Sequence, residues 1–500
     1  MKIAIIGGGF MGLALAYRIS ELGYETKVLE RADQPGGLCT YQDYGPFVWD
    51  SFYHVITPID DDLKAFIGEI GLEKDLNWRQ SLTGYYAGKK FYSLSTSKEF
   101  LRFPVLSIFD KMRLGFTLFY GSRIDDFKKL EKITAKDWLI KIGGRRTYER
   151  FWAPVLYAKL GENRDKVSAV FIWTYIKRLF RSRSSAAQKE HMGYVSGGYK
   201  TVFDRIEKLL LEKGSQMQLN TGVEEIRADP DGGGINVRHG SVTEHFDKVV
   251  FTGPLNVLGK VAAPELVTIS GNTGAIEYLG VVCLVLVTKK PISPFYVLNI
   301  GDSDTPFTGV IGMSSVVDLD ETAGHHITYF PKYIASDHEY WSKSDEELES
   351  LFLKGVQDMY PEFDPNDIHS AHLNRAFKVQ PLQILDYSET IPKVHTKHPD
   401  FYVLNTSQFV NESVNNNSVI RHVDSFMTGF EGELQAASQN ASEESSQNAS
   451  KEASQATSRN ISGNSSQNTA RNIPKEASHK VPKTPSEEAI KNSAGYRKRA

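Results

Sequence analysis

A glycine-rich turn close to the N-terminus constrains the fold of this chain more than any other stretch. The apolar run over residues 2–6 predicts a buried parallel strand. The turn that follows, GGGFMG over residues 7–12, fits the pattern G-x-G-x-x-G. A helical pattern over 13–22 and a second strand over 25–29, which leads into Glu30, complete a βαβ unit.

Each part of this unit has a role in binding a dinucleotide. Gly7 permits the tight turn, Gly9 lets the backbone approach a pyrophosphate, and Gly12 lets the helix pack closely on the strand. The helix N-terminus presents free N–H groups to the phosphates. Glu30 can accept hydrogen bonds from a ribose 2′-OH and would repel the 2′-phosphate of NADP. The unit predicts a dinucleotide site, with an ordinary βα turn as the alternative, and leaves NAD and FAD open.

The residues that follow Glu30 favour FAD. They read RADQPGGL, and this stretch resembles the extended FAD fingerprint of the amine oxidase, phytoene desaturase and protoporphyrinogen oxidase superfamily. The resemblance implies that the Gly36-Gly37 loop passes close to the flavin. Two glycines would allow that approach because neither carries a Cβ.

Three later segments resemble the same superfamily. FWAPVLYAKLG at 151–161 is similar to a segment of bacterial protoporphyrinogen-oxidase-like proteins, and GYVSGGYK at 193–200 resembles the return of the chain to the FAD domain. Residues 401–430 resemble the C-terminal FAD motif, in which a helix N-terminus points at the isoalloxazine and stabilises the reduced flavin. Here three asparagines, 415–417, replace the usual glycine before the helix, which we expect at 419–426.

The resemblance implies a set of site residues. The expected cofactor-binding residues are Gly7, Gly9, Phe10, Met11, Gly12, Glu30, Arg31, Gly36, Gly37, Leu38, Val223, Asn405, Ser418 and Val419. His54, in a segment that lies near the ring system in the superfamily, is the candidate catalytic residue. The alternative for His54 is a hydrogen-bonded histidine in a packed loop. No metal site is expected.

The resemblance covers about residues 1–430 and implies an α/β fold. A Rossmann-type FAD-binding domain would be interrupted by an α+β substrate domain with an antiparallel sheet. The FAD-binding domain is expected over 1–85, 193–256 and 376–430, and the substrate domain over 86–192 and 257–375. Beyond residue 434 the chain is rich in Ser, Asn, Ala and Gln, which predicts a disordered tail over 434–500.

Three further segments show helical patterns, and the last two of them bear on the partners of the protein. Residues 60–82 look helical throughout. Residues 100–118 carry Leu, Phe and Met at helical spacing, which favours a core helix, with peripheral membrane contact as the alternative. The segment 172–183 carries cations that could hold an acidic substrate or form a solvated face: Lys177, Arg178, Arg181 and Arg183.

Composition excludes several classes of function. A net charge of −3 gives no electrostatic case for nucleic acid. The two cysteines, Cys39 and Cys283, form neither a disulfide framework nor a metal cluster and suit a reducing cytoplasm. No apolar run reaches the length of a transmembrane helix, and no signal peptide is visible.

The sequence therefore predicts an FAD-dependent oxidoreductase that removes hydride from a C–N or C–C bond of a small organic substrate. The resemblance favours a protoporphyrinogen-oxidase-like or desaturase-like reaction. The absence of a second G-x-G-x-x-G favours oxygen or a quinone as electron acceptor. Three alternatives stay open: a non-redox flavoenzyme of the UDP-galactopyranose mutase type, a NAD-dependent dehydrogenase, and a non-catalytic flavin-binding module.

Overall fold

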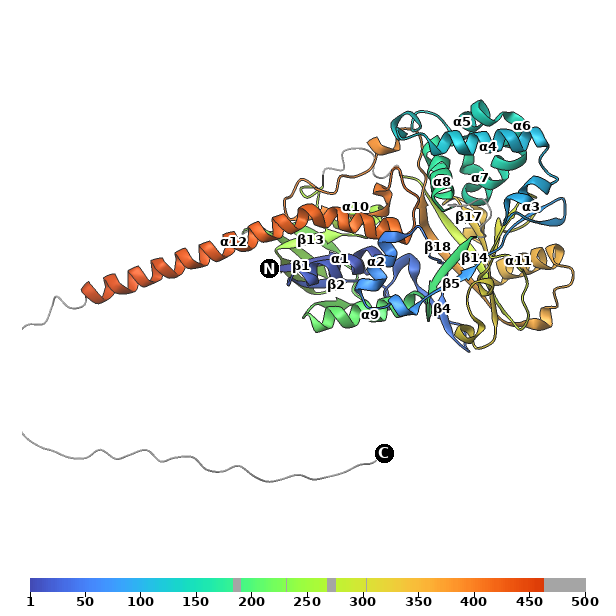
Figure 1. Cartoon of the computed structure of the whole chain (residues 1–500). Helices are drawn as coiled ribbons and strands as arrows, with labels where there is room; N and C mark the ends of the chain where they lie inside the picture. Colours follow the sequence, from blue (N-terminus) through green and yellow to red (C-terminus); the bar gives the residue numbers. More distant parts are fainter. Residues whose placement is uncertain (183–189, 231, 268–275, 303, 463–500) are drawn as a thin grey trace, which may run out of the picture. The chain divides into compact units, whose positions relative to one another are not determined.

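The computed structural model describes all residues except 183–189, 231, 268–275, 303 and 463–500. The chain divides into two units, residues 1–434 and 435–500. The folded body, 1–434, is built on two large sheets, and Figure 1 traces its elements from the N-terminus.

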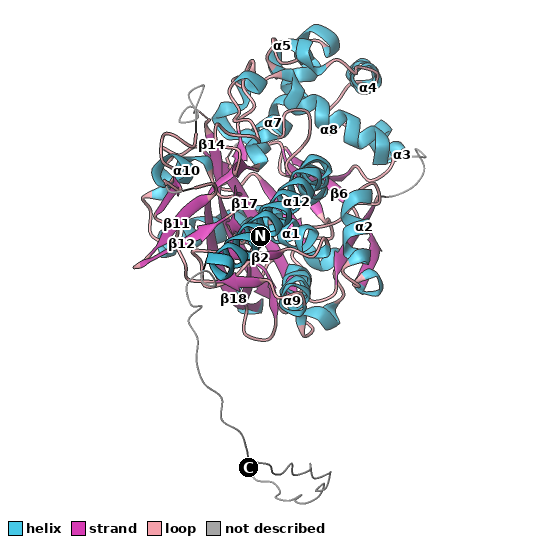
Figure 2. Ribbon diagram, turned by 90° about the vertical axis from the view of Figure 1, so that its left-hand side faces the viewer, coloured by secondary structure: helices cyan, strands magenta, loops and turns pink. Residues whose placement is uncertain are grey.

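A five-stranded parallel sheet carries the N-terminal motif. Its strands, in spatial order, are β19 (Phe401–Val403), β13 (Lys248–Phe251), β1 (Lys2–Ile6), β2 (Glu25–Leu29) and β9 (Gln216–Gln218). Four helices share an apolar core on one face: α1 (Phe10–Glu21), α2 (Asp61–Glu69), α9 (Gly198–Glu212) and α12 (Asn416–Ser462). Figure 2 shows α1 between α9 and α12. Strands from four separate parts of the sequence therefore meet in one sheet.

The other face of the parallel sheet packs against a small antiparallel sheet through the core cluster that includes Phe246 and Phe251. Its three strands are β10 (Glu225–Ala228), β11 (Ile235–His239) and β12 (Val242–Phe246), and α10 (Leu255–Val261) lies beside them.

The second large sheet has seven strands and is antiparallel except for one pair, β15 with β6. In spatial order its strands are β18 (Ile368–Pro381), β14 (Tyr278–Thr288), β17 (His326–Ile334), β16 (Gly309–Gly312), β15 (Val297–Ile300), β6 (Thr83–Ala87) and β7 (Lys90–Ser93). Helix α11 (Asp345–Met359) begins with a capping box between Ser344 and Glu347 and packs into the same core. The expected antiparallel sheet of the second layer is confirmed.

A group of helices lies beyond this sheet and gathers at one end of the body (Figure 1). Its members are α3 (Ser97–Arg102), α4 (Ile108–Ser122), α5 (Ala135–Gly143), α6 (Arg145–Thr147), α7 (Ala153–Leu160) and α8 (Ala169–Ser182). Two further strand pairs link the layers: β3 (Tyr41–Asp43) with β4 (Val48–Asp50), and β5 (Leu76–Gln80) with β8 (His191–Val195). The α/β fold with an inserted α+β part is as the sequence predicts, while the residue boundaries of the two domains stay a prediction.

Two helical predictions are wrong in part. The helix expected over 60–82 ends at Glu69, because Gly71 takes φ +83° and the chain continues as strand β5. The helix expected over 100–118 is two helices, α3 and α4, that break around Pro104, and one face of α4 is exposed. The core-helix interpretation therefore holds only for the other face of α4.

The C-terminal tail, for which the sequence predicts disorder over 434–500, forms a unit of its own from Gln435. Its backbone, however, continues as helix α12 as far as Ser462. Beside its many serines the segment contains Ala, Gln and Glu, which have high helix propensity even where no packing is available. The remainder of the tail, 463–500, lies outside the described residues.

Candidate functional site

The glycine turn between β1 and α1 leaves backbone N–H groups at a helix N-terminus. The first intrahelical hydrogen bond of α1 runs from the N–H of Leu13 to the carbonyl of Gly9 at 3.0 Å. The N–H groups of Phe10, Met11 and Gly12 precede that bond and have no acceptor within the helix. They lie where the pyrophosphate of a dinucleotide would bind.

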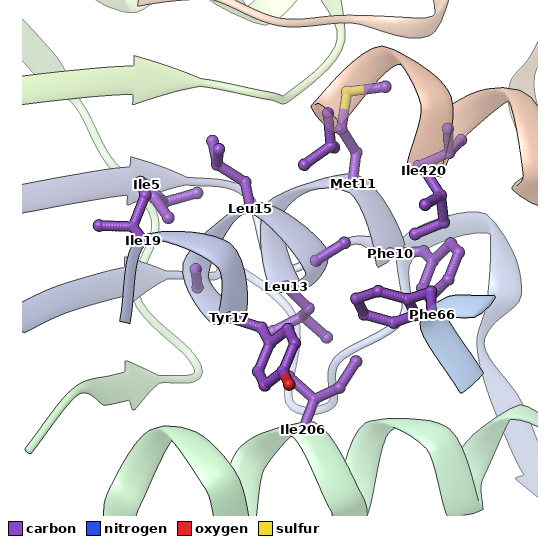
Figure 3. Packing of buried hydrophobic residues seen from close by; sticks show 14 of the residues in the cluster. Ile5, Phe10, Met11, Leu13, Leu15, Tyr17, Ile19, Phe66, Ile206 and Ile420 are labelled. Atoms are coloured by element: carbon purple, nitrogen blue, oxygen red, sulfur yellow. The ribbon is translucent and has the colours of Figure 1, made fainter. Parts of the chain in front are cut away.

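Close packing explains two of the glycines. A Cβ on Gly12 would stand 2.0 Å from the carbonyl oxygen of Gly7, and Gly7 itself has φ +116°. Helix α1 therefore begins in direct contact with the end of β1, and only glycine fits at both positions. The side chain of Phe10 packs into the core against Phe66 and Tyr199, so any contact with a cofactor is made by its backbone (Figure 3).

Glu30 closes the turn from the other side. Its Oε2 accepts a hydrogen bond from the N–H of Gly8 at 2.6 Å, and its Oε1 accepts one from the N–H of Ala32 at 2.8 Å. Both carboxylate oxygens are thereby held at the end of β2, with lone pairs left for ribose hydroxyls. The neighbouring Arg31 is exposed.

The Gly36-Gly37 loop lies against the glycine turn. Both residues have positive φ, +117° and +60°, and the N–H of Gly36 donates to the carbonyl of Gly8 at 2.9 Å. A Cβ on Gly37 would stand 3.1 Å from the Cα of Gly9. Gly37 and Leu38 are exposed beside the glycine turn. The two glycine segments, 7–12 and 36–37, therefore form one open surface, which side chains at these positions would block. We call this surface the cradle. This cradle fits a dinucleotide: the N-terminus of α1 would hold its phosphates, and the Gly36-Gly37 loop would border the flavin part.

The remaining predicted cofactor-binding residues lie on segments around the cradle. Val223 follows Thr221, whose N–H donates to the carbonyl of Glu30 at 2.7 Å, so this segment borders the end of β2. Asn405 follows β19 and donates from Nδ2 to the carbonyl of Gly253 at 2.6 Å. Ser418 and Val419 lie in the first turn of α12, which begins at Asn416, three residues before the start expected from the sequence.

The three asparagines each have a structural role. Asn415 caps α12 by accepting from the N–H of Ser418 at 3.0 Å. Asn416 accepts from the Cys39 thiol at 3.4 Å, and Asn417 accepts from the N–H of Leu63 at 2.9 Å. The N-terminus of α12 is thus bound to the Gly-Gly loop and to α2. In this way three segments far apart in the sequence meet at the cradle.

His54 lies in this same cluster. Its Nε2 is 3.8 Å from Sγ of Cys39, and its ring meets that of Tyr199 edge-on at 5.5 Å. Burial lowers the pKa of His54 to about 4, so the imidazole is neutral at pH 7. Burial likewise raises the pKa of the Cys39 thiol to about 12, which makes it a poor nucleophile.

Asp50 is a functional candidate that the sequence reasoning did not select. Its carboxyl is 2% exposed, Oδ1 accepts from the N–H of Tyr199 at 2.9 Å, and Oδ2 is 3.9 Å from Nδ1 of His54. Burial raises its pKa to about 8, so the carboxyl is largely protonated at pH 7. The 3.9 Å contact therefore joins two neutral groups rather than an ion pair. An aspartate at the end of a short strand gives no sequence signal of such burial.

Two cations of α8, Lys177 and Arg178, are occupied within the chain. Lys177 pairs with Asp125 at 2.6 Å, and Arg178 pairs with the 5% exposed carboxylate of Asp60 at 2.9 Å. The Arg181 side chain and Arg183 lie outside the described residues. Lys177 and Arg178 therefore hold carboxylates of this chain, and the expected grip on an acidic substrate gains no support from them.

Comparisons with known proteins agree with this geometry. The family model for flavin containing amine oxidoreductase matches residues 11–393. The chain is 24% identical over 259 residues to zeta-carotene desaturase of Solanum lycopersicum, covering 45% of this chain and 42% of the relative. It is 25% identical over 275 residues to phytoene desaturase (neurosporene-forming) of Rhodobacter capsulatus, covering 50% and 51%. The chain thus spans about half or less of the length of these curated relatives.

Solved structures show the same fold. A candidate protoporphyrinogen oxidase from Exiguobacterium sp. 255-15 superposes with a TM-score of 0.68 at 16% identity, covering 86% of this chain and 99% of that one. At this identity the likeness concerns the fold alone. The family match covers more than half of the 500 residues, and the cradle described above fits its cofactor. The chain therefore belongs to the flavin-containing amine oxidoreductase family, with FAD as its cofactor.

Proposed function

We propose that this protein is an FAD-dependent oxidoreductase that removes hydride from a C–C or C–N bond of a small organic substrate. The family assignment supports an oxidoreductase. Relatives named as zeta-carotene desaturase and phytoene desaturase favour oxidation of a C–C bond over simple amine oxidation.

The observation that carries the proposal is the uncharged pair beside the cradle. FAD, when bound, accepts the hydride. Neutral His54 and protonated Asp50 put no net charge near the reacting centre, which suits an apolar substrate. His54, as the proposed catalytic residue, would touch substrate or flavin, where its neutral ring could donate or accept a hydrogen bond.

The cofactor contacts proposed here are those of the cradle. The N–H groups of Phe10, Met11 and Gly12 would bind pyrophosphate, and Glu30 would bind ribose. The remainder of the FAD molecule would be bordered by the Gly36-Gly37 loop, Val223, Asn405 and the first turn of α12. Oxygen or a quinone is the proposed acceptor. The buried free cysteines support a reducing cytoplasm as the proposed location.

Two of the alternatives now have less support. A NAD-dependent dehydrogenase does not agree with the flavin family. The UDP-galactopyranose mutase type needed free cations on α8, and Lys177 and Arg178 are both paired with carboxylates. The non-catalytic flavin module remains as the outcome of a failed activity test.

The test begins with the visible spectrum of the purified protein and the identity of the flavin released by heat. The holoprotein is then mixed without oxygen with three substrate classes: a polyene or porphyrinogen, a primary amine, and a UDP-galactose. Bleaching of the flavin band by the first class alone, followed by recolouring with oxygen or a quinone, is the expected result. Bleaching by amines alone would contradict the preference for a desaturase-like or protoporphyrinogen-oxidase-like reaction over simple amine oxidation. Turnover of the sugar nucleotide without net oxidation would contradict the proposal as a whole. No bleaching by any class would favour the binding module.

A further inference from the structure

Helix α4 has two faces of different kinds. One face is buried and packs in the helical group through Asp110, Leu114, Thr117 and Gly121, which recur at intervals of three and four residues. The opposite face carries large apolar side chains at the same helical spacing, and all of them are exposed: Ile108, Phe109, Met112, Phe116, Phe119 and Tyr120. We call these six residues the α4 apolar face.

The α4 apolar face is unusual for a soluble surface. Phe109 is 72% exposed, Met112 66% and Phe116 57%. Leu101 of α3, 61% exposed, extends the patch, because the ammonium of Lys111 binds the Leu101 carbonyl at 2.7 Å and ties α3 to the first turn of α4. Contiguous exposed apolar side chains of this kind mark an interaction surface.

Cations border this face, and the acids near it are already engaged by other groups of the chain. Residues 97–123 contain five cations, Lys98, Arg102, Lys111, Arg113 and Arg123, and two acids, Glu99 and Asp110. Both acids are used in capping boxes, and Asp110 is 1% exposed. Arg113 and Lys111 lie on opposite edges of the apolar stripe, and Arg123 stacks over Phe119 at 5.0 Å. The exposed charge around the patch is therefore positive.

We propose that the α4 apolar face docks on the surface of a lipid bilayer that contains anionic phospholipid. Its Phe and Met side chains would enter the boundary between headgroups and acyl chains, and the bordering Arg and Lys would bind phosphates. Among the described residues no helix is long and apolar enough to cross a membrane, so the contact would be interfacial. Helix α4 lies at the outer edge of the folded body (Figure 2), so a bilayer surface could contact it.

Charge argues against a second copy of the chain as the occupant. A two-fold contact through this face would place Arg113 and Arg123 of one copy beside the cations of the other. The acids of 97–126 are already engaged: Glu99 and Asp110 are held in capping boxes. Asp125 pairs with Lys177, and Asp126 pairs with Lys129. An anionic lipid surface supplies both the apolar layer and the opposite charge.

The first experiment is flotation of the full-chain holoprotein with vesicles of phosphatidylcholine, with and without one third phosphatidylglycerol. We expect binding to the anionic vesicles that weakens in high salt. The variant F109S/M112S/F116S should lower the partition coefficient more than tenfold, because it removes three side chains from the interface. R113E/R123E should abolish the preference for anionic lipid. The matched control L211S/V242S changes exposed apolar residues elsewhere and should bind like the parent.

A second measurement reports the face directly. Both native cysteines are buried, so a cysteine introduced by F116C is the accessible thiol for an environment-sensitive dye. Its emission should shift to the blue on anionic vesicles, whereas the same dye at L211C should not shift. Flavin content and circular dichroism of each variant establish that it is folded.

Three outcomes would overturn the proposal: no partitioning of the folded holoprotein, partitioning unchanged in F109S/M112S/F116S, or a dimer in sedimentation that the triple variant dissociates. The last outcome would assign the face to a second copy. None of these results depends on the substrate of the flavin site.

Discussion

The carboxylate of Glu30 accepts a hydrogen bond from the backbone N–H of Gly8 at 2.6 Å. This bond joins the end of β2 to the turn after β1, and it fixes the acid beside the proposed dinucleotide site. Glu30 therefore has two tasks, since it shapes the turn and can accept from the ribose. Replacements that separate charge from shape can distinguish them.

Glu30→Gln keeps an acceptor oxygen for Gly8 but removes the charge and the acceptor for Ala32, and we expect FAD affinity to fall about tenfold. Glu30→Ala also removes the acceptor for Gly8 and should weaken binding further. Titration of apoprotein with FAD, followed by flavin fluorescence, gives the dissociation constants. Glu25→Gln, at the exposed start of the same strand, is the matched control. Equal affinity in Glu30→Ala and the parent would show that Glu30 does not contact the cofactor.

Gly12→Ala should destabilise the protein by about 3 kcal/mol or more, because its Cβ would stand 2.0 Å from a backbone oxygen that cannot move alone. We expect little soluble protein and no bound flavin. Gly429→Ala is the control, since a Cβ there meets nothing within 4 Å in an exposed turn of α12. It should stabilise the protein by roughly 0.5–1 kcal/mol in urea unfolding. A flavin-loaded, stable Gly12→Ala protein would contradict the packing described for α1.

The geometry of the glycine turn is predictable from the sequence because its contacts are local. Gly7, Gly12 and Glu30 lie within one βαβ unit, where spacing alone determines the geometry. The roles of Asn415 and Asn417 were not predictable in the same way. Asn417 binds Leu63, more than 350 residues away, and no local pattern indicates that partner.

Helical periodicity also has a limit that α4 illustrates. The sequence of α4 has apolar residues on two faces, one at positions 109, 112 and 116 and one at 114 and 118. This spacing predicts a helix but does not indicate which face is buried. Only the packing of Leu114 against the helical group decides it. The extent of α2 was missed for a different reason, since Gly71 ends the helix by taking positive φ within a continuing apolar pattern.

His54→Phe tests the proposed catalytic residue. Phenylalanine keeps the volume of the ring beside Tyr199 but has no nitrogen, so we expect normal flavin content and a fall in kcat of more than tenfold. His245→Phe, at a half-exposed position of β12, is the control and should leave turnover unchanged. Unchanged kcat in His54→Phe would assign the residue to packing alone.

Asp50 should make stability depend on pH in an unusual direction. Its pKa is raised to about 8 in the folded protein, against an ordinary value of 3.8, so between these values the folded state holds a proton that the unfolded state has lost. Stability must then decrease as pH rises through this range. His54 acts oppositely between about pH 4 and 6.5, since there the unfolded state alone binds its proton. The effect of Asp50 is therefore isolated above pH 6.5.

Asp50→Asn keeps the acceptor for the Tyr199 N–H and removes the ionisation. Between pH 6.5 and 8 the parent should lose about 2 kcal/mol of unfolding free energy relative to this variant, from a slope of about 1.4 kcal/mol per pH unit. Urea unfolding of flavin-loaded protein at matched pH values measures the difference, with Asp33→Asn as an exposed control that follows the parent. Parallel curves for the parent and Asp50→Asn would mean that Asp50 is ionised when folded. His54 would then lie beside a negative charge, and an apolar, uncharged reaction centre would no longer describe this site.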